Sequence, residues 1–397
     1  MKFFFLVFFT AFLITSFSNA KNDIKKVDIN LIKFRNDEDH NEKKGYTGII
    51  LGKKYPQNRA ILTGIEENKV KLSLLKTQLV LKEHFINDLS DFSKLTKGFP
   101  KNSITILDLP EKIMEEIINI LPEGLAFINA RISKNSFREK NCKKNLFNII
   151  PSDKMYTDSL AQFLILKNWK NVLVLYGPKD EDKNKYLSFL DSSKKYKLKI
   201  INERKFTLSK NPEDREANNP KLLTKGKKSD TIVIFDYFGE FSRNLPFNTM
   251  YPTPVVGDIG LTPRAWHWAW ERNGAPQLNK RFQRNDYNLS WEVKDRKMQD
   301  SDWAAWVSIK IIAESLKIKD ENEKINFLKL FQKKTLAVDM YKGKVGSFRN
   351  WNNQLRQPIL LSTHNAVITK MPNEKFLHKI NAEDTLGFDI SDSKCLF

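Results

Sequence analysis

Strand-like and helix-like segments alternate along the first third of this chain. Four apolar runs have the composition of buried strands, and three segments between them have the apolar spacing of helices. The strands are predicted at residues 27–34, 78–81, 103–107 and 125–129, and the helices at 58–67, 88–95 and 111–121. Strands and helices that alternate with short connections form a mostly parallel sheet wrapped by helices. We therefore expect an α/β fold for this part of the chain.

The same pattern starts again in the middle of the chain. The polar stretch 211–228 is broken by Pro212 and Pro220, so we interpret it as a loop with a weak helix. Two consecutive α/β units of similar size predict two lobes that face each other across a cleft, each lobe a mostly parallel sheet flanked by helices. In this second unit, helices are predicted at 157–169 and 183–192, and strands at 172–176, 199–206, 231–236 and 253–258.

The last third of the chain has a different character. Residues 302–316 form the strongest amphipathic pattern of the chain, a second helix is predicted at 321–335, and residues 341–397 are rich in strand and turn signals. We expect residues 21–150 to form an N-terminal α/β lobe and residues 151–260 a second α/β lobe. Residues 261–397 would then supply an aromatic segment, crossover helices and C-terminal strands that complete both lobes.

The N-terminus has the layout of a secretory signal peptide. Lys2 supplies a positive charge, residues 3–13 are an almost unbroken apolar run, and Ser18 and Ala20 place small residues before a cleavage point. The apolar run is too short for a membrane-spanning helix. We expect residues 1–20 to be removed and the mature protein to reach the periplasm, with an uncleaved N-terminal anchor as the alternative.

A formal net charge of +20 raises the question of a nucleic-acid partner. The surplus is mostly lysine: only 14 of the 67 basic residues are arginine, the residue favoured for bidentate contacts with phosphates and bases. The sequence also contains no nucleic-acid-binding motif. We expect no nucleic-acid partner and interpret the charge as a bias of the surface composition.

Cys142 and Cys395 are the only two cysteines of the chain. In an oxidising compartment they can pair and tie the middle of the chain to its C-terminus. Two unpaired thiols are the alternative. The cysteines and the five scattered histidines do not have the spacing of a zinc site, so we expect no metal ion.

The motifs of common enzyme classes are missing from the sequence. It contains no GxxxxGK(S/T), no GxGxxG after a strand, no GxSxG and no HExxH. No nucleophile, base and orienting group can be assembled from the remaining residues. We therefore expect a protein that is not an enzyme, has no catalytic residues and needs no cofactor.

Tryptophans gather in one segment of the chain. Trp266 and Trp270 are four residues apart and would share one face of a helix, with Trp268 turned away from them. Large aromatics at this spacing are more often core than ligand platform, but three tryptophans in five residues are hard to bury on one helix. A core role and an aromatic wall facing a cleft or a partner both stay open, whereas Trp303 and Trp306 lie on an apolar stripe and are assigned to the core. Six of the eight tryptophans fall in this part of the chain: Trp266, Trp268, Trp270, Trp291, Trp303 and Trp306.

Four segments resemble one particular family of proteins. They are WHWAWERNGAPQLNKRF at 266–282, DSDWAAWV at 300–307, FRNWNNQLRQPILLSTHNAV at 348–367 and DTLGFDISDSKCLF at 384–397. These segments are similar to the periplasmic substrate-binding proteins of an ABC transporter associated with PQQ-dependent alcohol dehydrogenase systems. The chain departs from that family at its end, where Leu396 follows Cys395 in place of the usual arginine.

The resemblance implies a fold and a function. The family belongs with the branched-chain amino acid type of binding proteins, the type I periplasmic binding proteins, in which three crossings join two α/β lobes. It implies that a small solute binds in the inter-lobe cleft and is delivered to an ABC transporter permease, in a system linked to PQQ-dependent alcohol oxidation. The alternative is an accessory protein that does not serve transport and docks to a periplasmic PQQ-dependent dehydrogenase through the aromatic segment.

In such a fold, the ligand contacts come from loops that follow the strands at the cleft. These loops are predicted at residues 130–133, 176–180, 236–239 and 257–260. Each candidate also has a structural explanation: Asp236 could cap a turn, and Tyr176 could finish a core strand. The candidate ligand residues are Tyr176, Asp236, Tyr237, Asp258, Trp266 and Trp268.

Overall fold

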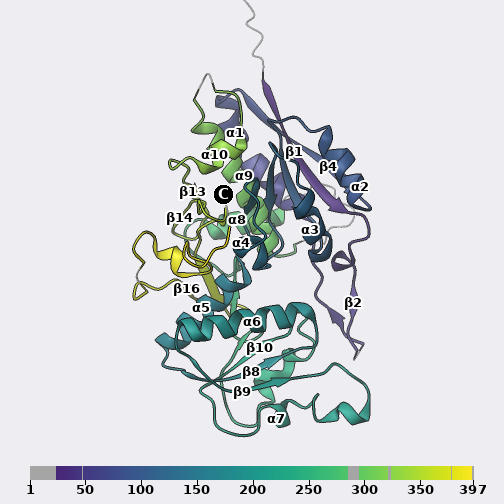
Figure 1. Cartoon of the computed structure of the whole chain (residues 1–397), viewed down its shortest axis with the longest axis vertical. Coiled ribbons are helices and arrows are strands. Elements are labelled where there is room, and N and C mark those ends of the chain that lie inside the picture. The colour runs from purple at the N-terminus through teal and green to yellow at the C-terminus, as the bar shows by residue number, and fades with distance from the viewer. Residues whose placement is uncertain (1–23, 47, 285–294, 321–322, 377, 396–397) are drawn as a thin grey trace, which may run out of the picture.

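The computed structural model describes residues 24–46, 48–284, 295–320, 323–376 and 378–395. These residues form two lobes, each built on its own parallel sheet (Figure 1). The expected α/β class with two helix-flanked parallel sheets is therefore confirmed. The predicted signal peptide and Trp291 lie outside the described residues. Within the described residues, none of the helices is both long and apolar enough to cross a membrane.

The sheet of the first lobe has five parallel strands in the order β4-β1-β5-β6-β7. Its strands are β1 (Lys25–Phe34), β4 (Thr77–Ile86), β5 (Ile104–Asp108), β6 (Ala126–Asn129) and β7 (Leu146–Asn148). The helices between them are α1 (Asn58–Leu74), α2 (Leu89–Lys97), α3 (Glu111–Ile117) and α4 (Ser136–Glu139). Asp88 caps α2 by accepting a hydrogen bond from the backbone N–H of Asp91, as its position before the apolar periodicity indicated.

The central strands β1, β5 and β6 of this sheet pack against a core on both faces, which explains their high apolar content. In β1, Ile29 and Leu31 belong to a core shared with α1, whereas Ile32 belongs to a core shared with α2 and α3. Three helices from far along the chain complete the first of these cores: α8 (Ala275–Arg284), α9 (Asp300–Lys317) and α10 (Phe327–Gln332). Trp303 and Trp306 of α9 are fully buried there, so their assignment to the core is confirmed.

The sheet of the second lobe has four parallel strands in the order β11-β10-β8-β9. The strands are β8 (Asn171–Tyr176), β9 (Lys199–Lys205), β10 (Thr231–Phe235) and β11 (Val255–Gly257). The helices are α5 (Asp153–Leu166), α6 (Asp180–Lys195) and the short α7 (Pro220–Leu223). Val172 and Val174 face the core beneath α5 and α6, and Leu173 and Leu175 face the opposite core.

A small antiparallel sheet lies where the two lobes meet. It consists of β12 (Thr262–Arg264), β15 (Ile359–Ser362) and β16 (Val367–Met371), with β15 in the middle. Neighbouring residues of β15 serve different lobes: Leu360 packs in the core of the first lobe, and Ile359 and Leu361 pack in that of the second. The backbone passes between the two cores at three places: between β7 and α5, after β12, and before β15.

Two short hairpins and a set of 3-10 turns complete the elements. The hairpin of β2 (Lys43–Lys44) and β3 (Ile50–Leu51) extends from the first lobe toward the second (Figure 1), where the Tyr46 hydroxyl donates to Asn218 over 3.4 Å. The other hairpin pairs β13 (Val338–Asp339) with β14 (Val345–Gly346). The 3-10 turns span Glu38–His40, Ile118–Ile120, Pro212–Arg215, Ser242–Phe247 and Ala382–Thr385.

Two predicted helices in the last third of the chain differ from the structure. Trp266–Trp270 is not helical: the backbone turns there, with the Trp270 N–H bonded to the His267 carbonyl over 3.0 Å. The helix α8 begins only after Asn273 and Gly274, which both have positive φ. The helix predicted at 321–335 is shorter, because α10 spans only Phe327–Gln332 and Asn326 caps its first turn.

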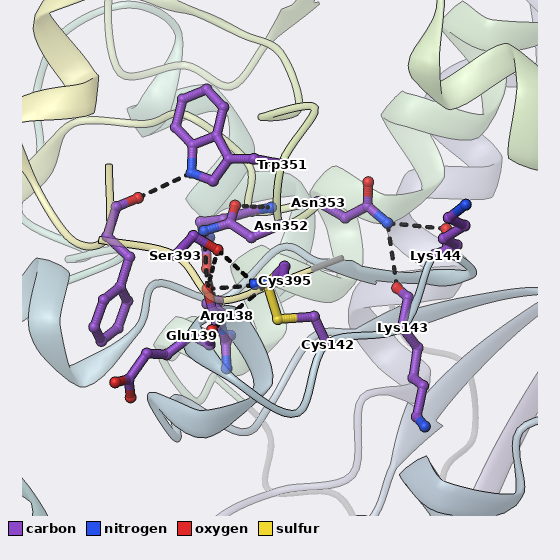
Figure 2. Close-up of a disulfide and its surroundings, with 12 residues drawn as sticks. Arg138, Glu139, Cys142, Lys143, Lys144, Trp351, Asn352, Asn353, Ser393 and Cys395 are labelled. Atoms are coloured by element: carbon purple, nitrogen blue, oxygen red, sulfur yellow. Dashed lines mark hydrogen bonds between the residues drawn. A yellow bond between two sulfur atoms is a disulfide. The ribbon is translucent and has the colours of Figure 1, made fainter. Parts of the chain in front are cut away.

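Residues 382–395, which we call the C-terminal segment, run from the second lobe back to the first. Cys142 and Cys395 form a disulfide with their Cα atoms 5.5 Å apart. Figure 2 shows this bond beside Arg138, Glu139 and Ser393. The bond joins the end of the chain to the connection between α4 and β7.

Candidate functional site

A cavity of about 1710 Å³ lies between the two lobes. Its lining includes the loops that follow β1, β5 and β6 in the first lobe and β10 and β11 in the second. The carboxyl ends of parallel strands meet at one edge of a sheet, and ligands of α/β proteins bind at that edge. Here the two such edges face the same cavity.

A buried ion cluster forms the first-lobe wall. The Arg131 guanidinium lies 2.5 Å from Asp37, 3.0 Å from Asp108 and 3.0 Å from Asp39. Burial by itself would lower the pKa of Arg131, but these carboxylates outweigh it and raise the pKa above its usual range. Because the arginine charge is matched by carboxylates of this chain, the cluster holds the loops after β1 and β6 in place.

Lys54 connects this cluster to the second lobe. Its ammonium group lies 3.1 Å from Asp39 and donates a hydrogen bond to the hydroxyl of Tyr237. It also lies 4.7 Å from the centre of the Tyr237 ring. Burial lowers the pKa of Lys54, and the neighbouring Arg131 lowers it further. The contact between Lys54 and Tyr237 therefore bridges the cavity from one lobe to the other.

The second-lobe wall is a chain of hydrogen bonds between carboxylates and the loops after β10 and β11. Lys185 of α6 lies 2.7 Å from Asp258, which also accepts a 2.9 Å hydrogen bond from the backbone N–H of Asp236. Asp236 in turn accepts a 2.8 Å hydrogen bond from the N–H of Ser242. Asp236 is buried, and burial raises its pKa. Its carboxylate thus holds the turn that carries Tyr237, which itself donates its N–H to Asp182 over 2.7 Å.

A third group of polar residues lies where the chain first crosses between the lobes. Asp153, the first residue of α5, accepts a 2.7 Å hydrogen bond from the Ser133 hydroxyl and donates its own N–H to the Ser133 carbonyl over 2.8 Å. Within the described residues, this is the one hydrogen bond found for the Asp153 carboxylate. Burial raises the pKa of Asp153 to about 6. Ser133, Asp153 and Tyr156 all line the cavity.

The tryptophans of the aromatic segment divide between core and cavity. Trp266 is 1% exposed, donates its indole N–H to Asn279 over 3.1 Å, and is stacked with Trp303 at 6.2 Å. Trp270 is also buried and donates to the Tyr341 carbonyl. Trp268 is half-buried and lines the cavity, with the Lys297 ammonium 3.0 Å from its ring centre. Because the backbone turns here and does not form a helix, the Trp268 side chain is half-buried in the cavity lining, whereas those of Trp266 and Trp270 are buried in the core.

Five of the six candidate ligand residues line the cavity, and one does not. Asp236, Tyr237, Asp258, Trp266 and Trp268 are all part of its lining. Tyr176 lies apart from it, because its ring is stacked on Tyr186 of α6 at 4.1 Å. Tyr176 packs against the core of the second lobe and thus finishes a core strand.

Sequence reasoning missed three polar residues of the cavity. Arg131 lies inside the predicted loop 130–133, but its partners come from strand β5 and from the loop after β1. Lys54 follows the β2–β3 hairpin, and Asp153 lies at the first residue of a helix that was predicted to start at 157. A serine and an aspartate just before an apolar helix are a capping pattern, and this pattern could have placed α5 and Asp153 correctly.

Comparison with known proteins gives the same picture of the fold. Residues 124–247 match the family described as the receptor family ligand binding region. No curated protein matches this sequence. A branched chain amino acid ABC transporter periplasmic ligand-binding protein from Burkholderia xenovorans LB400 has a TM-score of 0.67 at 11% sequence identity, covering 93% of this chain and 99% of that chain.

Two ligand complexes are similar to this chain in the same way. The branched-chain amino acid transporter substrate binding protein from Streptococcus pneumoniae, in complex with isoleucine, has a TM-score of 0.58 at 14% identity, covering 87% of this chain and 99% of that chain. The ABC transporter solute binding protein from R. palustris, in complex with benzoate, has a TM-score of 0.58 at 12% identity, covering 88% and 98%. Together with the two sheets and the cavity between them, these matches establish that the chain has the two-lobed α/β fold of periplasmic binding proteins.

Proposed function

We propose that this chain is the periplasmic solute-binding component of an ABC transporter and that a small solute binds between its lobes. The observation that carries the proposal is the cavity of about 1710 Å³, which is lined by the carboxyl-end loops of both sheets. The contact between Lys54 and Tyr237 supports closure of the two lobes around a solute. The proposed role is binding, not catalysis, in keeping with the binding proteins that share this fold.

The cavity residues support a solute that offers a hydrogen-bond donor. Asp153 is buried, and a solute amine or hydroxyl would satisfy its carboxylate without removing the bond from Ser133. Tyr237, Asp258 and Trp268 would supply further contacts, whereas Asp236 would act by holding the turn before Tyr237. The isoleucine and benzoate bound in the two similar complexes support a small organic molecule as the solute.

The narrower proposal concerns the system in which the transporter works. The segments at 266–282, 300–307, 348–367 and 384–397 support a link to PQQ-dependent alcohol oxidation. The partners would then be a permease in the membrane and a small solute related to alcohol oxidation. We propose a periplasmic location for the mature chain, on the basis of the signal-like residues 1–20 and the periplasmic proteins that share the fold.

A thermal melting screen tests the proposal. The panel contains alcohols, aldehydes, carboxylates, amino acids and PQQ, each over a range of concentrations. Because a ligand that binds only the folded state stabilises it, a true solute raises the melting temperature in proportion to the logarithm of its concentration. Asp153→Asn should reduce the shift for amines and alcohols. If no compound of the panel shifts the melting temperature, the solute-binding proposal is wrong for these classes.

The alternative of an accessory protein that docks to a dehydrogenase receives less support. It relied on the aromatic segment as an interface, but Trp266 and Trp270 are buried in the core of the first lobe. Only Trp268 of the three is half-buried and faces the cavity. Co-purification with a PQQ-dependent dehydrogenase, together with no association with a permease, would favour the accessory protein instead.

A further inference from the structure

The C-terminal segment is bonded to the second lobe through α5 and α6. The carbonyl of Thr385 accepts hydrogen bonds of 2.7 Å from both the Lys195 ammonium and the Tyr196 hydroxyl. Two residues further on, the N–H of Gly387 donates to the carboxylate of Asp158 over 2.9 Å. Asp158 is fully buried, so the segment is fixed to the body of the second lobe and not only to its surface.

The same few residues are bonded from the other side by a loop of the first lobe. Arg349 is fully buried and donates to the carboxylate of Asp384 over 2.8 Å and to the carbonyls of Glu383 and Leu386 over 2.8 and 2.7 Å. Trp351 donates its indole N–H to the Phe388 carbonyl over 3.1 Å. This loop lies beside the edge strand β7 of the first sheet, where it forms a bridge between Gln354 and Asn148.

The end of the C-terminal segment is attached to the first lobe by a covalent bond. The N–H of Lys394 donates to the Glu139 carbonyl over 2.7 Å, and Cys395 is joined to Cys142. The attachment point is itself tied to the loop of Arg349, since the Asn352 side chain donates to the Arg138 carbonyl over 3.1 Å (Figure 2). The covalent path from β16 through this segment to Cys142 therefore begins at the second lobe and ends at the first.

We propose that the Cys142–Cys395 disulfide makes the C-terminal segment a fourth covalent crossing between the lobes, which restrains their opening. Three backbone crossings act as a hinge, and hinge opening in such proteins rotates one lobe relative to the other. A fourth link beside the hinge must stretch or slide when the lobes rotate. With the bond intact, the segment is held covalently at both ends, by the backbone from β16 in the second lobe and by Cys142 in the first. With the bond broken, a chain end held only by hydrogen bonds can fray from the first lobe.

The test measures the distance between the lobes in solution. Azide-bearing amino acids replace the exposed Lys101 of the first lobe and Lys227 of the second, and a donor and an acceptor dye are attached to them. This labelling leaves both cysteines intact. In the Cys142→Ser/Cys395→Ser variant we expect a broader distribution of inter-lobe distances with its mean shifted to longer distances. Ser391→Ala, an exposed change in the same segment that keeps the bond, should match the unsubstituted protein.

A second measurement covers the case in which the double variant does not fold. The folded protein is treated with a reducing agent, thiol labelling confirms that the bond is open, and circular dichroism confirms that the fold persists. The distance distribution should broaden as in the variant, and amide hydrogen exchange should increase in residues 388–395. Unchanged distances in a folded, fully reduced protein overturn the proposal. The measurement needs no solute, so its outcome is independent of the function proposed above.

Discussion

Lys54 of the first lobe and Tyr237 of the second meet across the cavity, where the lysine ammonium donates to the tyrosine hydroxyl. Tyr237→Phe removes this acceptor while keeping the ring. A hydrogen bond to a charged group contributes about 1.5 kcal/mol, so solute affinity should fall about tenfold as the open state becomes more populated. Small-angle X-ray scattering and titration calorimetry measure the two effects.

Tyr251→Phe, at an exposed position outside the cavity lining, is the control. Identical scattering and affinity in Tyr237→Phe would show that the contact does not hold the lobes together.

Asp153 should make the stability of the fold depend on pH. Burial raises the pKa of its carboxyl from 3.8 to about 6, so the folded state binds more protons than the unfolded state between these values. Stability from this group is present at low pH and is lost as pH rises through about 6, a change of about 2 to 3 kcal/mol. Urea unfolding at several pH values should show this loss in the unsubstituted protein and not in Asp153→Asn. In the exposed control Asp191→Asn, the loss should remain.

Removal of the cation from the buried ion cluster at Arg131 should strongly destabilise the fold. Arg131→Met leaves the buried carboxylates of Asp37 and Asp108 without their cation, and a buried charge that loses its partner costs about 3 to 5 kcal/mol. The surface pair of Lys69 and Glu66, 70% and 62% exposed, is the matched control. Lys69→Met should cost less than about 1 kcal/mol. Similar losses for the two variants in urea unfolding would contradict a structural role for the cluster.

Substitution of Trp266 should mainly reduce the stability of the fold, and substitution of Trp268 should mainly weaken solute binding. Trp266 is fully buried against Trp303, so Trp266→Ala should destabilise the fold by about 3 to 5 kcal/mol. Trp268 is half-buried in the cavity lining, so Trp268→Ala should cost about 1 kcal/mol of stability and weaken solute binding more than that. Urea unfolding and calorimetry of both variants check this. If Trp268→Ala destabilises as much as Trp266→Ala, its role is packing.

The architecture could be predicted from the sequence because it depends on local patterns. The central strands of both sheets are rich in apolar residues, since each lies between two cores, and a segment such as 27–34 needs no distant information to be identified. The same holds for Asp88, whose capping role depends on three residues. The loops after these strands followed from the order of the elements, and five of the six candidate residues do line the cavity.

What the sequence could not reveal depends on contacts between distant segments. The spacing of Trp266 and Trp270 fits a helix, but their indole N–H groups are satisfied by Asn279 and by the Tyr341 carbonyl, which only a turn brings within reach. The role of Arg131 depends on carboxylates from β5 and from the loop after β1. The position of Tyr176 at a strand end predicted that it lies at the cavity. Its ring instead stacks on Tyr186, which comes from the next helix.

The first sheet also imposes an order of assembly on the chain. Its strands lie between residues 25 and 148, yet α9, which covers one of its faces, begins only at Asp300. A chain that emerges with its N-terminus first can cover part of that face with α1, but the part that α9 covers stays exposed while the whole second sheet, residues 171–257, is being made. Exposed apolar surface of this kind is prone to aggregation and calls for a chaperone. The cores of both lobes are thus completed only by residues from the last third of the chain, and loss of that third would leave both cores incomplete.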